Sequence, residues 1–155
     1  MRLFPYRTYT SGKRWCVFRW THVDPEGTGE IYLTRFHIFQ VPWCSCMLHW
    51  IYREDSQPDL HDHPNAFVSF VLKGWYVEEL ADKRAATGRL RRRVAFVNFK
   101  RALQGHRIVE LGRRPTITLV FAGRVVRGWG FQTPHGWRSW REYVANRRSR
   151  TDSQR

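Results

Sequence analysis

The chain has 155 residues, 42% of them apolar and 15% aromatic, and its formal net charge is +14. This length and composition indicate one globular domain with a hydrophobic core, and they exclude a wholly disordered chain. No stretch approaches the roughly 18 uncharged apolar residues of a membrane-spanning helix, and the first residues lack the continuous apolar segment of a secretion signal. We therefore expect a cytoplasmic protein without a membrane partner.

Short segments of alternating apolar and polar residues follow one another along the chain, and they predict β-strands. The first two cover residues 30–41 and 46–53. Residues 66–80 predict two strands that turn at Lys73-Gly74, and three further strands are expected over 88–99, 106–111 and 115–123. Residues 137–148 fit either a last strand or a short helix.

Short strands at about ten-residue spacing, without a long amphipathic helix or an internal repeat, predict an all-β sandwich or barrel. A double-sheet jelly roll suits this length. We expect an N-terminal segment over residues 1–29 that packs on the barrel and a single domain over 30–145. Residues 146–155 contain no apolar residue, so we expect a basic, disordered tail there.

Two histidines, His61 and His63, are separated by one residue and followed by Pro64. On a β-strand, residues i and i+2 point to the same face, so the two imidazoles would project side by side. Neutral imidazoles bind borderline transition metals such as zinc, iron, nickel and copper. The spacing therefore indicates a metal site, and the alternative is a pair of polar residues at a strand edge.

The segment around these histidines resembles the first motif of the cupin superfamily, G-x5-H-x-H-x3,4-E-x6-G. His61 and His63 occupy the two histidine positions, and Gly74 stands where the motif closes. Two positions depart from the motif: Asp55 replaces the leading glycine, and Phe67 replaces the glutamate.

The second cupin motif, G-x5-P-x-G-x2-H-x3-N, is matched only at its histidine, for which His106 is the candidate. Arg101, Leu103 and Glu110 stand where proline, glycine and asparagine are expected. The segments LHDHPNAFVSFVLKGWYVEE, GHRIVEL, TLVFAGRVVRGWGF and GWRSWREY look similar to a group of small RmlC-like cupins of phage and bacterial genomes. This resemblance covers residues 30–143 and implies a double-stranded β-helix, the cupin jelly-roll barrel.

The resemblance also implies that His61, His63 and His106 converge inside the barrel and hold one divalent transition metal. Phe67 removes the usual carboxylate ligand, so the metal would keep its full charge and favour an anionic small-molecule substrate. Three-histidine cupins of the cysteine-dioxygenase kind use iron, so Fe(II) is favoured, with zinc, manganese and nickel as alternatives.

Five further residues are candidates for the same interior. Glu78 and Tyr76 share a face of their strand, and Glu78 could serve as a general base or a fourth ligand, or simply face solvent. His49 and Arg35 are candidate substrate-binding residues, although a hydrogen-bonded core histidine and a polar sheet face are the favoured explanations of the two. Arg127 could bind a carboxylate or phosphate with two parallel hydrogen bonds.

The leading functional hypothesis is a metal-dependent oxygenase of the three-histidine, non-haem iron type. The first alternative is a sugar-type isomerase or epimerase, with a histidine base and Tyr76 as a weak candidate for the acid. The second alternative is a non-catalytic protein that binds nucleotides or nucleic acid. The arginine-rich charge would support weak, non-specific nucleic-acid binding, but an arginine-favouring genome explains it as well. A homodimer formed by pairing of sheets is also expected.

Overall fold

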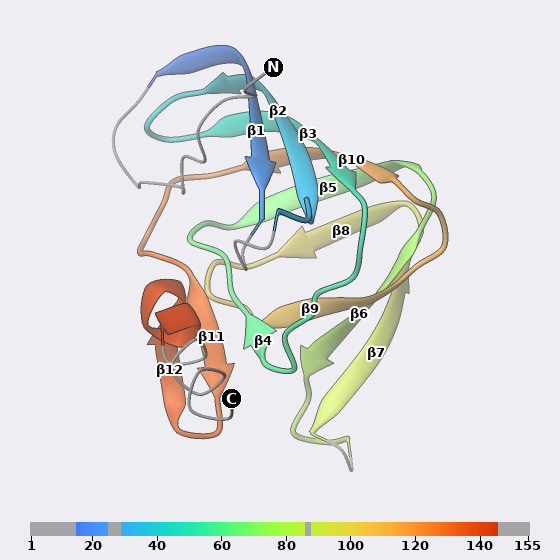
Figure 1. Ribbon diagram of the computed structural model, residues 1–155, viewed down its shortest axis with the longest axis vertical. Coiled ribbons are helices and arrows are strands. Elements are labelled where there is room, and N and C mark those ends of the chain that lie inside the picture. The colour runs from blue at the N-terminus through green and yellow to red at the C-terminus, as the bar shows by residue number, and fades with distance from the viewer. Residues whose placement is uncertain (1–14, 25–28, 86–87, 146–155) are drawn as a thin grey trace.

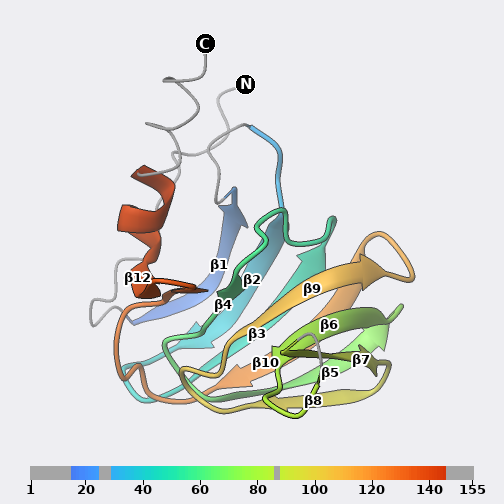
Figure 2. The same cartoon turned by 90° about the horizontal axis from the view of Figure 1, so that it is seen from below.

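The computed structural model describes residues 15–24, 29–85 and 88–145. These residues form two antiparallel six-stranded sheets, shown from two directions in Figures 1 and 2. The first sheet has the order β1 (Cys16–Val23), β2 (Leu33–Gln40), β3 (Ser45–Ile51), β10 (Thr116–Ala122), β5 (Phe67–Lys73), β8 (Val97–Lys100). The second has the order β12 (Gly136–Ser139), β11 (Gly130–Thr133), β4 (Leu60–His61), β9 (His106–Leu111), β6 (Tyr76–Ala81), β7 (Arg89–Val94).

The core lies between the two sheets and is built from the inward positions of alternating strands. One cluster joins Ile51 of the first sheet to Tyr76, Val94 and Ile108 of the second. Because neighbours in each sheet are often distant in sequence, as with β3 and β10, the chain passes repeatedly between the sheets. The predicted all-β jelly roll is therefore confirmed.

The strands predicted around residues 30–41, 46–53, 66–80, 106–111 and 115–123 are all present, as β2, β3, β5 with β6, β9 and β10. The turn at Lys73-Gly74 is also confirmed. Gly74 has a φ of +84°, which disfavours any residue with a side chain, and an added Cβ would lie 2.9 Å from the hydroxyl oxygen of Thr116. The motif's closing glycine is thus required by a tight approach of two segments.

Two sequence interpretations need correction. The single strand predicted over 88–99 is divided by a bend at residues 95–96, and its halves, β7 and β8, belong to different sheets. Residues 94–97 are all apolar, so the sequence pattern alone could not show the bend. For residues 137–148, we left strand and helix as alternatives, but both occur: β12 covers Gly136–Ser139 and residues 140–145 form a short helix.

The N-terminal segment contributes an edge strand that the sequence analysis did not identify. β1 pairs with β2 along its length, from Cys16 opposite Gln40 to Val23 opposite Leu33. Residues 1–14 and the tail predicted over 146–155 lie outside the described residues, so the proposed domain boundaries stay predictions. In the described part of the chain, no helix is long and apolar enough to cross a membrane.

Candidate metal centre

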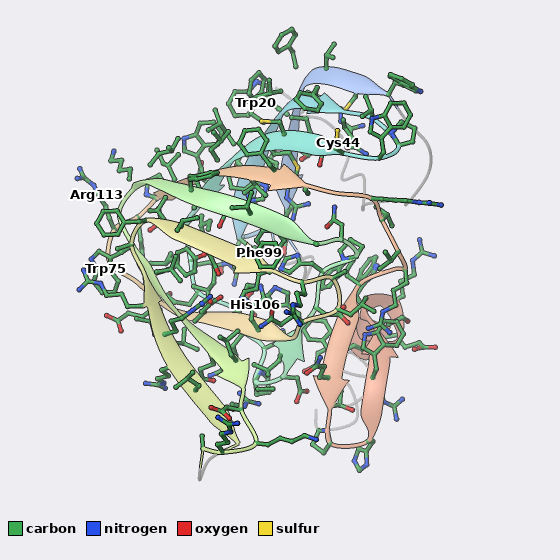
Figure 3. All side chains as sticks on the ribbon, turned by 180° about the vertical axis from the view of Figure 1, so that it is seen from behind. Trp20, Cys44, Trp75, Phe99, His106 and Arg113 are labelled. Atoms are coloured by element: carbon green, nitrogen blue, oxygen red, sulfur yellow. The ribbon has the colours of Figure 1, made fainter. Side chains whose placement is uncertain are left out.

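Three histidines meet in the interior of the barrel. His61 is the last residue of β4 and pairs directly with His106, the first residue of β9, and His63 follows two positions after His61. Their candidate ligand nitrogens all lie within 4.8 Å of one another. The Nε2 atoms of His63 and His106 are 2.7 Å apart, and the rings of His61 and His106 are 4.7 Å apart between centroids. Figure 3 shows His106 lying between the sheets.

His61 and His63 lie side by side, with ring centroids 5.1 Å apart, as their spacing led us to expect. The strand is shorter than expected, because β4 contains only Leu60 and His61 and His63 lies beyond its end. The intervening Asp62 donates its backbone N–H to the carbonyl oxygen of Gly130, and its carboxylate accepts hydrogen bonds from the Gly130 backbone and from Nε1 of Trp137. These bonds attach the segment between the two histidines to the β11–β12 hairpin.

The surroundings of the cluster keep His61 and His63 uncharged at neutral pH. Burial lowers the pKa of His61 to about 4, although Asp55, whose carboxylate lies 3.7 Å from Nδ1, opposes the effect. Burial and the neighbouring His106 also place the pKa of His63 well below its usual value. Neutral imidazoles keep a lone pair free for coordination, so this state favours metal binding.

The donor set fits a divalent transition metal. Three neutral imidazole nitrogens suit zinc, iron, copper or nickel, and a three-ligand set leaves further coordination positions open. No carboxylate among the described residues joins the three histidines in the cluster. Phe67, at the position of the motif's glutamate, instead packs edge-on against His63 with ring centroids 4.9 Å apart. A metal here would be held by uncharged side chains alone.

Glu78 is placed behind the cluster rather than within it. Its Oε2 accepts a hydrogen bond from Nδ1 of His106 at 2.9 Å and lies 2.8 Å from the ammonium nitrogen of Lys100. Its Oε1 accepts two hydrogen bonds from Arg92, at 2.6 and 3.1 Å, and a longer one from Asn98. The carboxylate is fully buried, and the His106 and Lys100 contacts lower its pKa to about 2 against the opposing effect of burial.

Tyr76 is linked to Glu78 through Asn98. It is buried, and its hydroxyl accepts a hydrogen bond of 2.8 Å from Nδ2 of Asn98. Burial raises the pKa of Tyr76 to about 12, so the phenol is protonated at neutral pH.

The sequence analysis missed Asn98, Lys100 and Arg92. Asn98 and Lys100 are separated by one residue on β8 and so share its inward face. Two polar residues at that spacing, between apolar neighbours, were the one available signal. Arg92 was hidden in a run of three arginines that reads as a solvated strand face.

Arg35 and His49 are opposite each other on β2 and β3. Burial chiefly, and then Arg35, places the pKa of His49 well below its usual value. Arg35 and His49 are also among the smaller causes of the lowered pKa of His63, after burial and the two neighbouring histidines. Their role in substrate binding stays a prediction.

Arg127 is held elsewhere. Its guanidinium forms a short ion pair with the buried Asp62 and lies 4.1 Å above the ring of Trp137. Asp62 also accepts hydrogen bonds from the Gly130 backbone and from Nε1 of Trp137. These contacts fasten the β11–β12 hairpin to the segment that carries His61 and His63.

Comparison with solved structures identifies the fold. A cupin-2 domain from Rhodospirillum rubrum matches with a TM-score of 0.57 at 14% identity, over 86% of this chain and 87% of that one. A candidate mannose-6-phosphate isomerase from Ralstonia eutropha JMP134 matches with a TM-score of 0.51 at 14% identity, over 68% and 99%. The Fe(II) form of HppE matches with a TM-score of 0.51 at 11% identity, over 75% of this chain and 66% of that one.

This chain thus spans just under two thirds of the length of HppE. No family model matches the sequence, and no curated protein matches it. The chain has the fold of the cupin superfamily, as the two motifs indicated.

Proposed function

We propose that this protein is a metal-dependent cupin enzyme that acts on an anionic small molecule. One divalent transition metal would be held by His61, His63 and His106. The observation that carries the proposal is the convergence of three imidazoles in the barrel interior. We favour Fe(II) and an oxygenase of the three-histidine, non-haem type, and Fe(II)-HppE shows that the fold accommodates iron.

A divalent metal held by this set would supply Lewis-acid or redox chemistry to a bound substrate. The side chains of the chain would then select and orient the substrate. No carboxylate joins the three histidines among the described residues, so a bound metal would keep its positive charge. Arg35 and His49, which are paired across β2 and β3 of the first sheet, would bind the anionic end of the substrate. The structure gives Arg127 a buried carboxylate partner, so its contribution to binding would be made through the position of the hairpin.

The isomerase alternative rests on Tyr76. A general acid must be protonated at working pH, and the raised pKa of this phenol meets that requirement. The likeness to a candidate mannose-6-phosphate isomerase also supports it at the level of the fold. Its weakness is geometric, because the Tyr76 hydroxyl is joined to Asn98 rather than to a histidine of the cluster.

The remaining expectations stay predictions. A homodimer would use the outer face of the first sheet, where Phe70, Leu72, Val97, Phe99 and Phe121 are exposed. Weak nucleic-acid binding would use exposed arginines such as Arg93 of β7.

Nitric oxide binding to Fe(II)-loaded protein tests the oxygenase proposal without knowledge of the substrate. An open position on a three-histidine iron should bind nitric oxide and give the electron paramagnetic resonance signal of a high-spin, S = 3/2 iron nitrosyl. The His106→Ala variant, treated identically, should give none. Iron-loaded wild-type protein that shows no such signal would contradict the open coordination that the oxygenase requires.

A further inference from the structure

Behind His106 lies a group of charged and polar side chains that we call the Glu78 cluster: Glu78, Arg92, Asn98 and Lys100. Glu78 and Lys100 are fully buried, and Asn98 is 2% exposed. The cluster joins β6 of the second sheet to β8 of the first. Burying a carboxylate and an ammonium group is costly, and packed apolar residues would often stabilise such a place better. The cost suggests a role beyond holding the sheets together.

Each carboxylate oxygen of Glu78 contacts two neighbouring side chains. Lys100 and His106 both contact Oε2, at 2.8 and 2.9 Å, and Arg92 and Asn98 both contact Oε1. The N–H groups of Arg92 and Asn98 donate to Glu78, so its carboxylate serves as the acceptor in this group. Nδ1 of His106, 2.9 Å from Oε2, is therefore a donor and carries the proton.

The position of this proton determines which ring nitrogen of His106 has a lone pair available for coordination. With the proton on Nδ1, the lone pair of the neutral ring is on Nε2. Nε2 is the atom that lies 2.7 Å from Nε2 of His63, at the centre of the three-histidine cluster. The same hydrogen bond fixes the rotation of the ring about its Cβ–Cγ bond, because Nδ1 must stay within reach of Glu78.

We propose that the Glu78 cluster is a positioning device that presents Nε2 of His106 to the metal. Glu78 holds the ring in one tautomer and one orientation, and Lys100 and Arg92 hold Glu78 in place. The inference rests on the proposed metal site and gives Glu78 a role different from the general base or fourth ligand expected from the sequence.

The neighbouring glutamate provides a matched comparison. Glu79 follows Glu78 on β6 and is also held by several cations, with Arg89, Arg91 and Arg107 at 2.9–3.1 Å. It lies on the opposite face of the strand and contacts none of the three histidines by any hydrogen bond that the described residues show. Removing its charge breaks an ion cluster of similar size without touching the metal site.

Nitrogen-15 NMR of the histidine rings in metal-free wild-type protein is the first test, and it requires no substitution. Long-range proton–nitrogen correlations distinguish a ring protonated at Nδ1 from one protonated at Nε2. At neutral pH, we expect His106 as the Nδ1–H tautomer. A ring protonated only at Nε2, or one that exchanges between the two tautomers, would overturn the proposal.

The second test compares the affinity for Zn²⁺, measured by competition with a chelator, in wild type, Glu78→Gln and Glu79→Gln. Loss of a hydrogen-bond partner of a metal ligand typically weakens metal binding about 10–100-fold, and we expect that loss for Glu78→Gln only. Equal affinities in the two variants would refute a positioning role. If Glu78→Gln does not fold, the Glu78→Gln/Lys100→Met double variant removes both buried charges and takes its place.

The two proposals fail in different ways. A wild-type protein that binds no metal contradicts the proposed function, whatever the tautomer of His106. A wild-type protein that binds metal tightly with His106 in the other tautomer contradicts only the role of the Glu78 cluster.

Discussion

Replacing Lys100 by methionine tests whether the Glu78 cluster is as tightly coupled as its distances indicate. Lys100 is fully buried with its ammonium nitrogen 2.8 Å from Oε2 of the equally buried Glu78. Removing one partner of a buried ion pair costs about 3–5 kcal/mol, because the remaining charge stays desolvated. Glu78 would keep Arg92 at 2.6 Å and His106 at 2.9 Å, so we expect about 3 kcal/mol, the lower end of that range.

The assay is urea denaturation of metal-free protein, followed by tryptophan fluorescence, with wild type and Lys83→Met measured alongside. Lys83 is an exposed turn residue, so its substitution should change the free energy of unfolding by less than about 0.5 kcal/mol. The double variant Lys100→Met/Glu78→Gln should be more stable than the sum of the single losses predicts, because it leaves no unpaired buried charge. A loss below about 1 kcal/mol for Lys100→Met would refute a buried, strongly coupled pair.

Two other predictions follow from the residues around the cluster. Phe67→Glu should return a carboxylate ligand to the side of His63 and tighten Zn²⁺ binding at least about tenfold. The control variant Phe67→Gln should not tighten it. Equal Zn²⁺ affinities for the two variants would show that position 67 cannot reach the metal. Burial, Arg35 and Arg19 lower the pKa of His37 to about 4. Between about pH 4 and 6.5, the unfolded chain therefore binds more protons at this residue than the folded chain does. The contribution of His37 should lower the free energy of unfolding as the pH falls through that range. His37→Gln should therefore flatten the decline in urea midpoint between pH 6.5 and 4, and a decline as steep as in wild type would contradict the assignment.

The sequence was informative about the fold because the strands obey a simple period. Alternating apolar residues located β2, β3, β5, β6, β9 and β10, and the glycine at position 74 located the turn between β5 and β6. The pattern failed where pairing rather than periodicity defines the strand. β4 has only two residues, and the bend between β7 and β8 interrupts no apolar run.

In the candidate site, too, the sequence motifs identified some residues, and others became apparent only from the arrangement of the strands. The cupin motifs identified His61, His63 and His106, and the structure brings these three residues together. The rings of His61 and His63 lie side by side as expected, but the strand expected to carry both residues ends at His61, and Asp62 binds the β11–β12 hairpin. The partners of Glu78 come from three strands, and a single sequence cannot indicate which strands a closed barrel brings side by side.

The metal content of protein purified without a polyhistidine tag tests the central claim most directly. Wild-type protein, loaded with Fe(II) or Zn²⁺ and freed of excess metal, should carry one equivalent, and His61→Ala, His63→Ala and His106→Ala should each lose it while keeping the β-rich circular dichroism of the wild type. His49→Ala, which removes a buried histidine outside the three-residue cluster, should keep metal near the wild-type level. A wild-type protein that takes up none of iron, manganese, cobalt, nickel, copper or zinc would contradict the account.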